Sequence, residues 1–301
     1  MIRNFVMLYL FLALAAQVLN ALVVLLDKYL IVSKSVAKPV VYAFLIAVLS
    51  GVVVIILPFG VIMTPTVVVI LLSLAVSFAY VFSILFLYKS LAVSDASDVA
   101  PILGAMSALS ALLFDLLFLG GHPMGNFLGG FVFLVVGTVL MSYFRFSGKS
   151  LAYVVFSGVL FGLSSVLVKM IFLETTFWNG FFWSRMGNVV AALIFLIPSA
   201  NRRVIFGNIL FSSFKTKFFV LANKTLAGFA FLLILIAINL GDVSVVNAIG
   251  GVQFVILIIF ALIFSKKFPN YFYESVHHRM TIMQKVTATI LISVGYALLF
   301  I

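Results

Sequence analysis

The fold is decided by the stretch PVVYAFLIAVLSGVVVIILPFGVIMTPTVVVILLSLAVSFAYVFSILFLY, from Pro39 to Tyr88, which contains no charged residue. A membrane-spanning helix needs about 20 apolar residues, so this stretch is too long for one span. Pro58, Gly60 and Pro65 interrupt it near the middle, where they indicate a tight turn. The stretch therefore predicts two membrane-spanning helices joined by that turn.

The composition of the whole chain extends this prediction. Of 301 residues, 65% are apolar and 8% are charged, whereas a soluble domain carries about a quarter charged residues. Long continuous apolar runs, rather than alternation, favour helices over a closed β-barrel. We expect an all-α integral membrane protein with no water-soluble domain.

The net charge of +11 does not predict a nucleic-acid partner. Most of the basic residues flank apolar segments, where Lys and Arg meet lipid headgroups. The chain has no cysteine, which excludes disulfides, thiol catalysis and cysteine metal sites. We expect no metal and no cofactor; the expected partners are membrane lipids and a small-molecule substrate.

We predict ten membrane-spanning helices. They are placed at residues 4–27, 39–58, 66–88, 98–119, 126–144, 151–172, 180–198, 218–239, 244–264 and 285–301. The two longer connections, 199–217 and 265–284, are predicted to be loops, the second of them lying on the headgroups. The first apolar segment continues to Leu26, which favours a span over a cleaved signal peptide.

Basic residues are concentrated in every second one of the predicted connections. The connections after the first, third, fifth, seventh and ninth helices hold fourteen Lys and Arg residues, and the termini and other connections hold only Arg3. Connections rich in Lys and Arg stay in the cytoplasm. The alternation therefore supports ten spans and predicts that both termini face outward.

The chain also contains an internal repeat. Residues 94–104 align with residues 241–251, and five of the eleven positions are identical. Gly137 and Gly295 occupy similar places in the last helix of each half, and Lys28 and Lys169 come late in the first. We therefore divide the chain into two five-helix repeats, 1–147 and 148–301. An odd number of helices per repeat inserts the halves in opposite directions, as in secondary transporters.

These residues resemble the EamA-like, ten-helix branch of the drug/metabolite transporter superfamily. The resemblance rests on the segment from Tyr88 to Met141, its counterpart from Ala237 to Phe264, and Asp27-Lys28-Tyr29-Leu30 at the end of the first helix. It implies two inverted EamA-like repeats around a central cavity lined by the fourth and ninth helices. Members usually carry Gly-Glu-Arg after each repeat's fourth helix, where this chain has Gly121-His122 and Ser265-Lys266-Lys267. Members also usually have a cytoplasmic N-terminus, whereas the charges here predict the opposite.

Placing a charged side chain inside the bilayer costs free energy, so each such residue indicates a structural or functional role. Lys169, Arg185 and Lys224 either snorkel to the headgroups or form a cationic wall for a carboxylate-bearing substrate. Arg185 is the strongest candidate, because Trp183 precedes it and Asn188 follows one turn later. Asp115 and Glu174 are candidates for proton coupling, since a dry site favours the neutral form of a carboxyl group. Alternatively, Asp115 is a carboxylate at a helix end that faces water or a basic neighbour. Glu174 could instead form an ion pair at the membrane surface.

Uncharged polar and ring-bearing residues complete the predicted cavity, although each alone could serve only helix packing. These candidates are Asn20, Tyr80, Pro101, Asn188, Asn247 and Gln253. The small-residue patterns Gly125-x-x-x-Gly129 and Gly158-x-x-x-Gly162 are interpreted as packing within the chain, so we expect a monomer, with a dimer as the alternative.

Together these features predict a secondary transporter that moves a small metabolite, such as an amino acid or another carboxylate, across the cell membrane by alternating access. Proton coupling is one way to drive it, and no nucleotide-binding motif is present. Two alternatives stay open, an intramembrane enzyme acting on a lipid-like substrate and a receptor or subunit that transports nothing. The scattered acids and the adjacent pair His277-His278 are poor metal or catalytic spacing, so we predict no enzyme activity.

Overall fold

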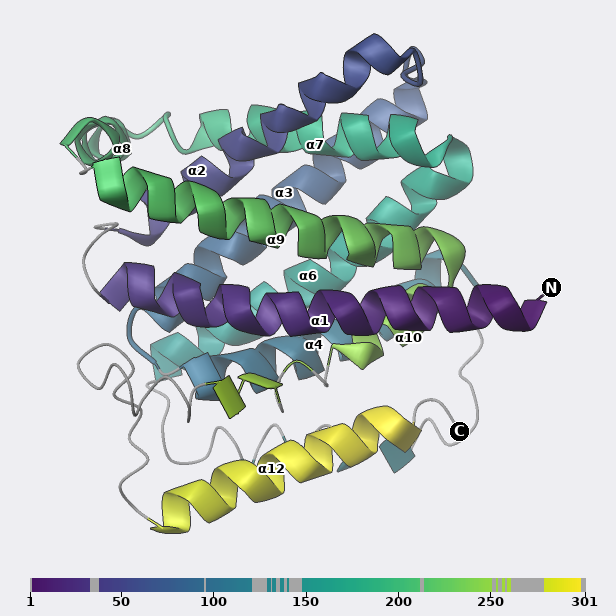
Figure 1. Cartoon of the computed structure of the whole chain (residues 1–301), viewed down its shortest axis with the longest axis vertical. Helices are drawn as coiled ribbons and strands as arrows, with labels where there is room; N and C mark the ends of the chain where they lie inside the picture. Colours follow the sequence, from purple (N-terminus) through teal and green to yellow (C-terminus); the bar gives the residue numbers. More distant parts are fainter. Residues whose placement is uncertain are drawn as a thin grey trace.

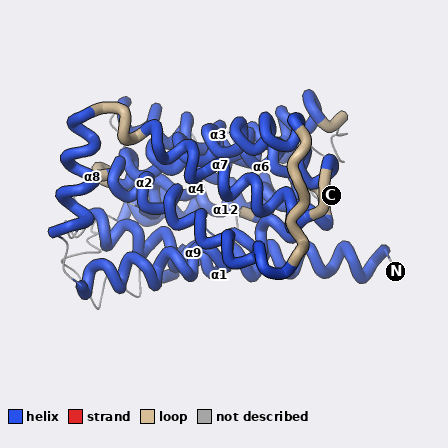
Figure 2. Tube along the Cα trace, turned by 90° about the horizontal axis from the view of Figure 1, so that it is seen from above, coloured by secondary structure: helices blue, strands red, loops and turns tan. Residues whose placement is uncertain are grey.

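The computed structural model describes residues 2–32, 38–94, 96–120, 148–211, 214–250 and 279–298, together with isolated residues between 129 and 140 and between 253 and 260. These residues form helices joined by short turns (Figures 1 and 2). The elements are α1 (Ile2–Val32), α2 (Pro39–Leu49), the 3₁₀ helix η1 (Ser50–Phe59), α3 (Val67–Leu91), α4 (Ala96–Phe118), α6 (Gly148–Glu174), α7 (Phe177–Ile194), α8 (Ser199–Phe211), α9 (Phe214–Leu240), α10 (Val243–Ile249) and α12 (Arg279–Leu298).

The helices are those of a membrane protein, which confirms the predicted all-α class. Among the described residues, six helical segments are long and apolar enough to cross a bilayer, namely α1, α2 with η1, α3, α4, α6 and α9. The bent pair of α7 and α8 makes a seventh if it is counted as one span. The predicted fifth and ninth spans lie mostly outside the described residues, as do residues 121–122 and 265–267, so ten spans remain a prediction.

Local sequence explains where several elements begin and end. Pro39 opens α2 at a position where its missing N–H costs nothing, and the Thr66 side chain accepts a hydrogen bond from the Val69 N–H at the start of α3. Gly60 ends η1 with φ 67°, in the left-handed region that glycine adopts without strain. The predicted turn near Gly60 is confirmed.

Two predicted loops contain helices. α8 occupies part of the predicted loop 199–217, and α12 begins at Arg279, inside the predicted loop 265–284. α8 turns by 112° from α7 and lies across one end of the bundle (Figure 1). The Pro198 carbonyl accepts the first hydrogen bonds of α8 from Asn201 and Arg202. With 13 residues, α8 is too short to cross a bilayer alone, so a search for long apolar segments misses it.

Neighbouring helices approach closely through small residues. α3 and α6 run antiparallel and are joined by hydrogen bonds between Ser83 and Ser157 and between Ser90 and Ser150. Gly158 and Gly162 of α6 lie against the backbone of α4, which confirms that this pattern serves packing within the chain. α1 and α9 run side by side and antiparallel (Figure 1), with Tyr9 against Gly241 at one end and Asp27 bound to Lys224 towards the other.

Candidate functional site

A buried ion pair joins α1 to α9. Lys224 Nζ lies 2.6 Å from Asp27 Oδ1, and only 7% and 5% of the two side chains are exposed. Three further donors surround the carboxylate: the Tyr42 hydroxyl at 2.6 Å, the Tyr88 hydroxyl at 2.8 Å and the Asn223 amide at 2.6 Å. Lys224 therefore does not snorkel, because its charge is held inside the protein.

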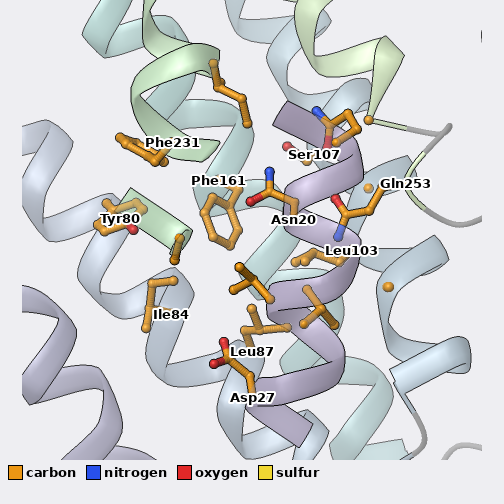
Figure 3. A pocket seen from close by; sticks show the side chains of 18 of the residues that line it. Asn20, Asp27, Tyr80, Ile84, Leu87, Leu103, Ser107, Phe161, Phe231 and Gln253 are labelled. Carbon is orange, nitrogen blue, oxygen red and sulfur yellow. The ribbon is translucent and has the colours of Figure 1, made fainter. Parts of the chain in front are cut away.

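A cavity lies next to this ion pair and is called here the chamber. It has a volume of about 210 Å³ and is lined by residues of α1, α2, α3, α4, α6, α9 and α10. Asn20 and Gln253 point into it from one side, and Tyr80, Phe161 and Phe231 bound another (Figure 3). Asn247 ties three helices together at the chamber wall, because its side-chain oxygen accepts hydrogen bonds from Ser107 of α4 and Ser165 of α6.

A second cavity of about 400 Å³, called here the cleft, lies between α2 with η1 on one side and α9 on the other. Tyr80, Lys224 and Phe231 line both cavities, so the two spaces adjoin. Most of the other cleft residues are aliphatic, such as Ile46, Val53 and Leu232. The two cavities together offer polar groups on one side and an apolar groove on the other.

Arg185 of α7 is a buried cation in the cleft. Only 6% of the residue is exposed, and its Nε has no hydrogen-bond partner. Its guanidinium lies 4.6 Å from the ring centre of Phe231 and 5.3 Å from that of Tyr80, a stabilising cation–π arrangement. Among the described residues, no carboxylate lies within 4.0 Å to form an ion pair with it.

The structure brings most of the predicted site residues together. Asn20, Tyr80, Lys224, Asn247 and Gln253 line the chamber, and Tyr80, Arg185 and Lys224 line the cleft. They come from segments that are far apart in the chain.

Four other predicted residues lie outside both cavities. Asn188 is buried and donates a hydrogen bond to Ser50 at the start of η1, and Pro101 is buried inside α4. Asp115 accepts a hydrogen bond from Ser244 across the contact between α4 and α10. Glu174 is exposed at the last residue of α6.

Lys169 also lies outside both cavities, in a position equivalent to that of Lys28. Lys169 Nζ donates to the carbonyls of Ile238 and Gly241 at the end of α9. Lys28 Nζ donates to the carbonyls of Leu91 and Ser94 at the end of α3. Ser94 and Gly241 are the first positions of the two aligned repeat segments. Each lysine therefore makes the same pair of contacts within its own half of the chain.

Asp27 was missed by the sequence reasoning. It lies within the apolar span Met7–Leu30, but the predicted helix ended at residue 27 and so placed the carboxylate at the headgroups. The helix continues to Val32. An acidic residue inside an apolar segment, in a chain with only seven acidic residues, is the signal that identifies it.

Comparison with solved structures identifies a shared fold. No protein-family model and no curated protein matches the sequence. A crystal structure of a protein aligns with 94% of this chain and 96% of its own, with a TM-score of 0.60 and 17% sequence identity. At that identity the likeness shows a shared fold only.

Proposed function

We propose that this protein is a secondary transporter that carries a small carboxylate-bearing metabolite across the cell membrane by alternating access. The proposal rests above all on Arg185, a buried cation that lines a cavity and has no acidic partner among the described residues. An unpaired charge inside a membrane protein is costly unless an anion accompanies it. A substrate carboxylate would supply that anion and accept two hydrogen bonds from the guanidinium.

The equivalent lysines support the inverted five-helix repeats on which alternating access depends. Lys28 and Lys169 cap the third helix of their respective halves at aligned positions. The proposed halves also meet through their last helices, since Gly137 lies against Ala288 and Ile292 of α12. Repeats that meet around a central cavity are the arrangement in which one half rocks against the other.

Asp27 is the carboxylate we propose for proton coupling, should transport be driven by protons. Among the described residues, no other acidic side chain lines the chamber or the cleft. Its protonation would release Lys224 from the ion pair and so link a proton to the charge of the substrate site. Asp115 stays the second candidate, because it is buried between α4 and α10.

An exchange assay in liposomes tests the proposed function. Purified protein in liposomes loaded with a panel of small carboxylates is expected to exchange at least one of them for its labelled form outside. Arg185→Gln should lower the initial rate about tenfold or more at low substrate concentration, because a hydrogen bond to a charged group is lost. The matched control is Arg202→Gln, since Arg202 is exposed on α8, and it should exchange at the wild-type rate.

Two results would contradict the proposal. The first is the absence of exchange with every member of a broad panel while circular dichroism shows intact helices. The second is an Arg185→Gln variant that exchanges as fast as the wild-type protein, which would remove Arg185 from the substrate site.

We further propose that both termini face the outside of the cell. The start of α1 and the end of α12 lie at the same end of the bundle (Figures 1 and 2), as an even number of crossings requires. The basic residues Arg202 and Arg203 lie on α8 at the opposite end, which the positive-inside rule assigns to the cytoplasm.

Protease access to tags in intact cells measures this orientation. A tag after Ile301 should be cleaved by external protease, and a tag after Val93, in the turn between α3 and α4, should be protected. Reversed accessibility of the two tags would show the N-terminus-inside topology that is usual in the EamA-like family.

A further inference from the structure

The two proposed halves differ at one contact. α3 is packed tightly against α7, because a Cβ on Gly187 would lie only 2.8 Å from the Ser73 carbonyl oxygen. In the proposed repeat, α9 corresponds to α3, and α2 with η1 corresponds to α7. This second pair is parted by the cleft, to which both sides contribute lining residues. The symmetry therefore predicts a closed contact where the structure has an opening.

The mouth of the cleft faces lipid. Val52 and Ile55 of η1 are each 66% exposed, and Leu221 and Phe229 of α9 are 52% and 62% exposed. All four line the cleft. Because they lie on segments apolar enough to span the membrane, their exposed faces meet acyl chains rather than water. An apolar molecule can reach the cleft sideways from the bilayer.

The floor of the cleft carries the positive charge. Arg185 and Lys224 both line it, and among the described residues Asp27 is the single carboxylate that pairs with either of them. One positive charge is therefore left over, on a guanidinium whose Nε is buried without a partner. An apolar groove that ends at an unpaired buried cation suits a molecule with a hydrocarbon chain and one anionic group.

We propose that the cleft binds an amphipathic carboxylate, with its carboxylate group on Arg185 and its hydrocarbon chain between η1 and α9. This inference rests on the proposed transport function and names the class of substrate. A carboxylate matches the planar fork of the guanidinium. A volume of about 400 Å³ is in the range of sites for single drug-sized molecules, which favours one short chain over a two-chain lipid.

Gly228 offers a way to fill the cleft without disturbing the fold. It lines the cleft, and no atom lies within 4 Å of the position that a Cβ would take. Gly228→Leu should therefore occupy the space of the hydrocarbon chain. Gly207 on α8 has equally open surroundings and does not line the cleft, so Gly207→Leu is the matched control.

The test is calorimetric titration of the full-length protein in phosphatidylcholine nanodiscs with butyrate, hexanoate and octanoate. The affinity should increase about fourfold for each methylene group that enters the cleft. Gly228→Leu should abolish this dependence on chain length, and Gly207→Leu should preserve it. Arg185→Gln should weaken the binding of octanoate about tenfold or more, and octylammonium should not bind.

Three outcomes would overturn the inference. They are an affinity that does not depend on chain length, a Gly228→Leu variant that binds octanoate like the wild-type protein, and octyl phosphate binding more than about tenfold tighter than octanoate, which would assign the site to phosphate-bearing lipids. None of these affects exchange of polar carboxylates in liposomes. Conversely, chain-length-dependent binding without exchange of any carboxylate would confirm the site and reject the transport function.

Discussion

Asp27→Ala is expected to destabilise the protein by about 3–5 kcal/mol, because it leaves Lys224 as an uncompensated buried charge. Lys224 Nζ lies 2.6 Å and 2.9 Å from the two carboxylate oxygens of Asp27. Its remaining neighbours are the Tyr88 hydroxyl at 3.2 Å and the ring of Tyr42, whose centre is 4.4 Å away. Neither can balance a full positive charge. Denaturant unfolding in mild detergent, followed by the fluorescence of Trp178 and Trp183, measures the free energy of unfolding.

The double variant Asp27→Asn with Lys224→Met separates a charge effect from a general loss of packing. It removes both charges and keeps side chains of similar size, so it should be much closer to the wild-type stability than Asp27→Ala. Glu174→Ala is the matched single control, because Glu174 is exposed, and it should change the stability by no more than about 0.5 kcal/mol. If Asp27→Ala matched Glu174→Ala, the ion pair would contribute nothing to the fold.

Gly162→Ala is expected to cost about 3 kcal/mol, the upper end of the usual range for overpacking. A Cβ at this position would lie 2.5 Å from the Ser107 carbonyl oxygen and 2.6 Å from the Ala111 backbone nitrogen. Both atoms belong to the backbone of α4, so no side-chain rotation can relieve the clash. α4 and α6 would have to separate, and the hydrogen bonds that Asn247 accepts from Ser107 and Ser165 would be lost with them.

The same unfolding measurement tests this second prediction, with Gly207→Ala as the matched control. Gly207 lies in α8 with no atom within 4 Å of a Cβ. Alanine there should stabilise the helix by up to about 1 kcal/mol, because it restricts the unfolded chain more than glycine does. Equal stabilities for the Gly162 and Gly207 variants would show that α4 and α6 tolerate a wider separation.

The sequence alone predicted the six helical segments that are long and apolar enough to cross a bilayer, because the thickness of the bilayer sets the length of such a segment. α3, predicted at residues 66–88, spans Val67–Leu91, and α6, predicted at 151–172, spans Gly148–Glu174. The helix that lies across the end of the bundle was predicted as a loop. α8 has 13 residues, too few to cross a bilayer alone, so a search for long apolar segments does not identify it as a separate helix.

The sequence also identified most of the charged candidates, although not Asp27, since a charged side chain in an apolar segment is rare. The sequence could not distinguish site residues from structural ones, because the burial and the interaction partners of each side chain depend on residues far away in the chain. Lys169 and Lys224 have the same chemistry and similar apolar surroundings in the sequence. One caps the end of α9 and the other is held by Asp27, 197 positions away.

The membrane class and the long apolar helices follow from local sequence, because each depends on composition or segment length. The inverted repeat is a prediction from the alignment of two short stretches. Tertiary structure alone decided that Asp27 neutralises Lys224, that Arg185 has no acidic partner among the described residues, and that α9 stands apart from η1. The reason is physical: the free energy of a buried charge depends on which distant helix supplies its partner, and the hydropathy of a segment does not contain that information.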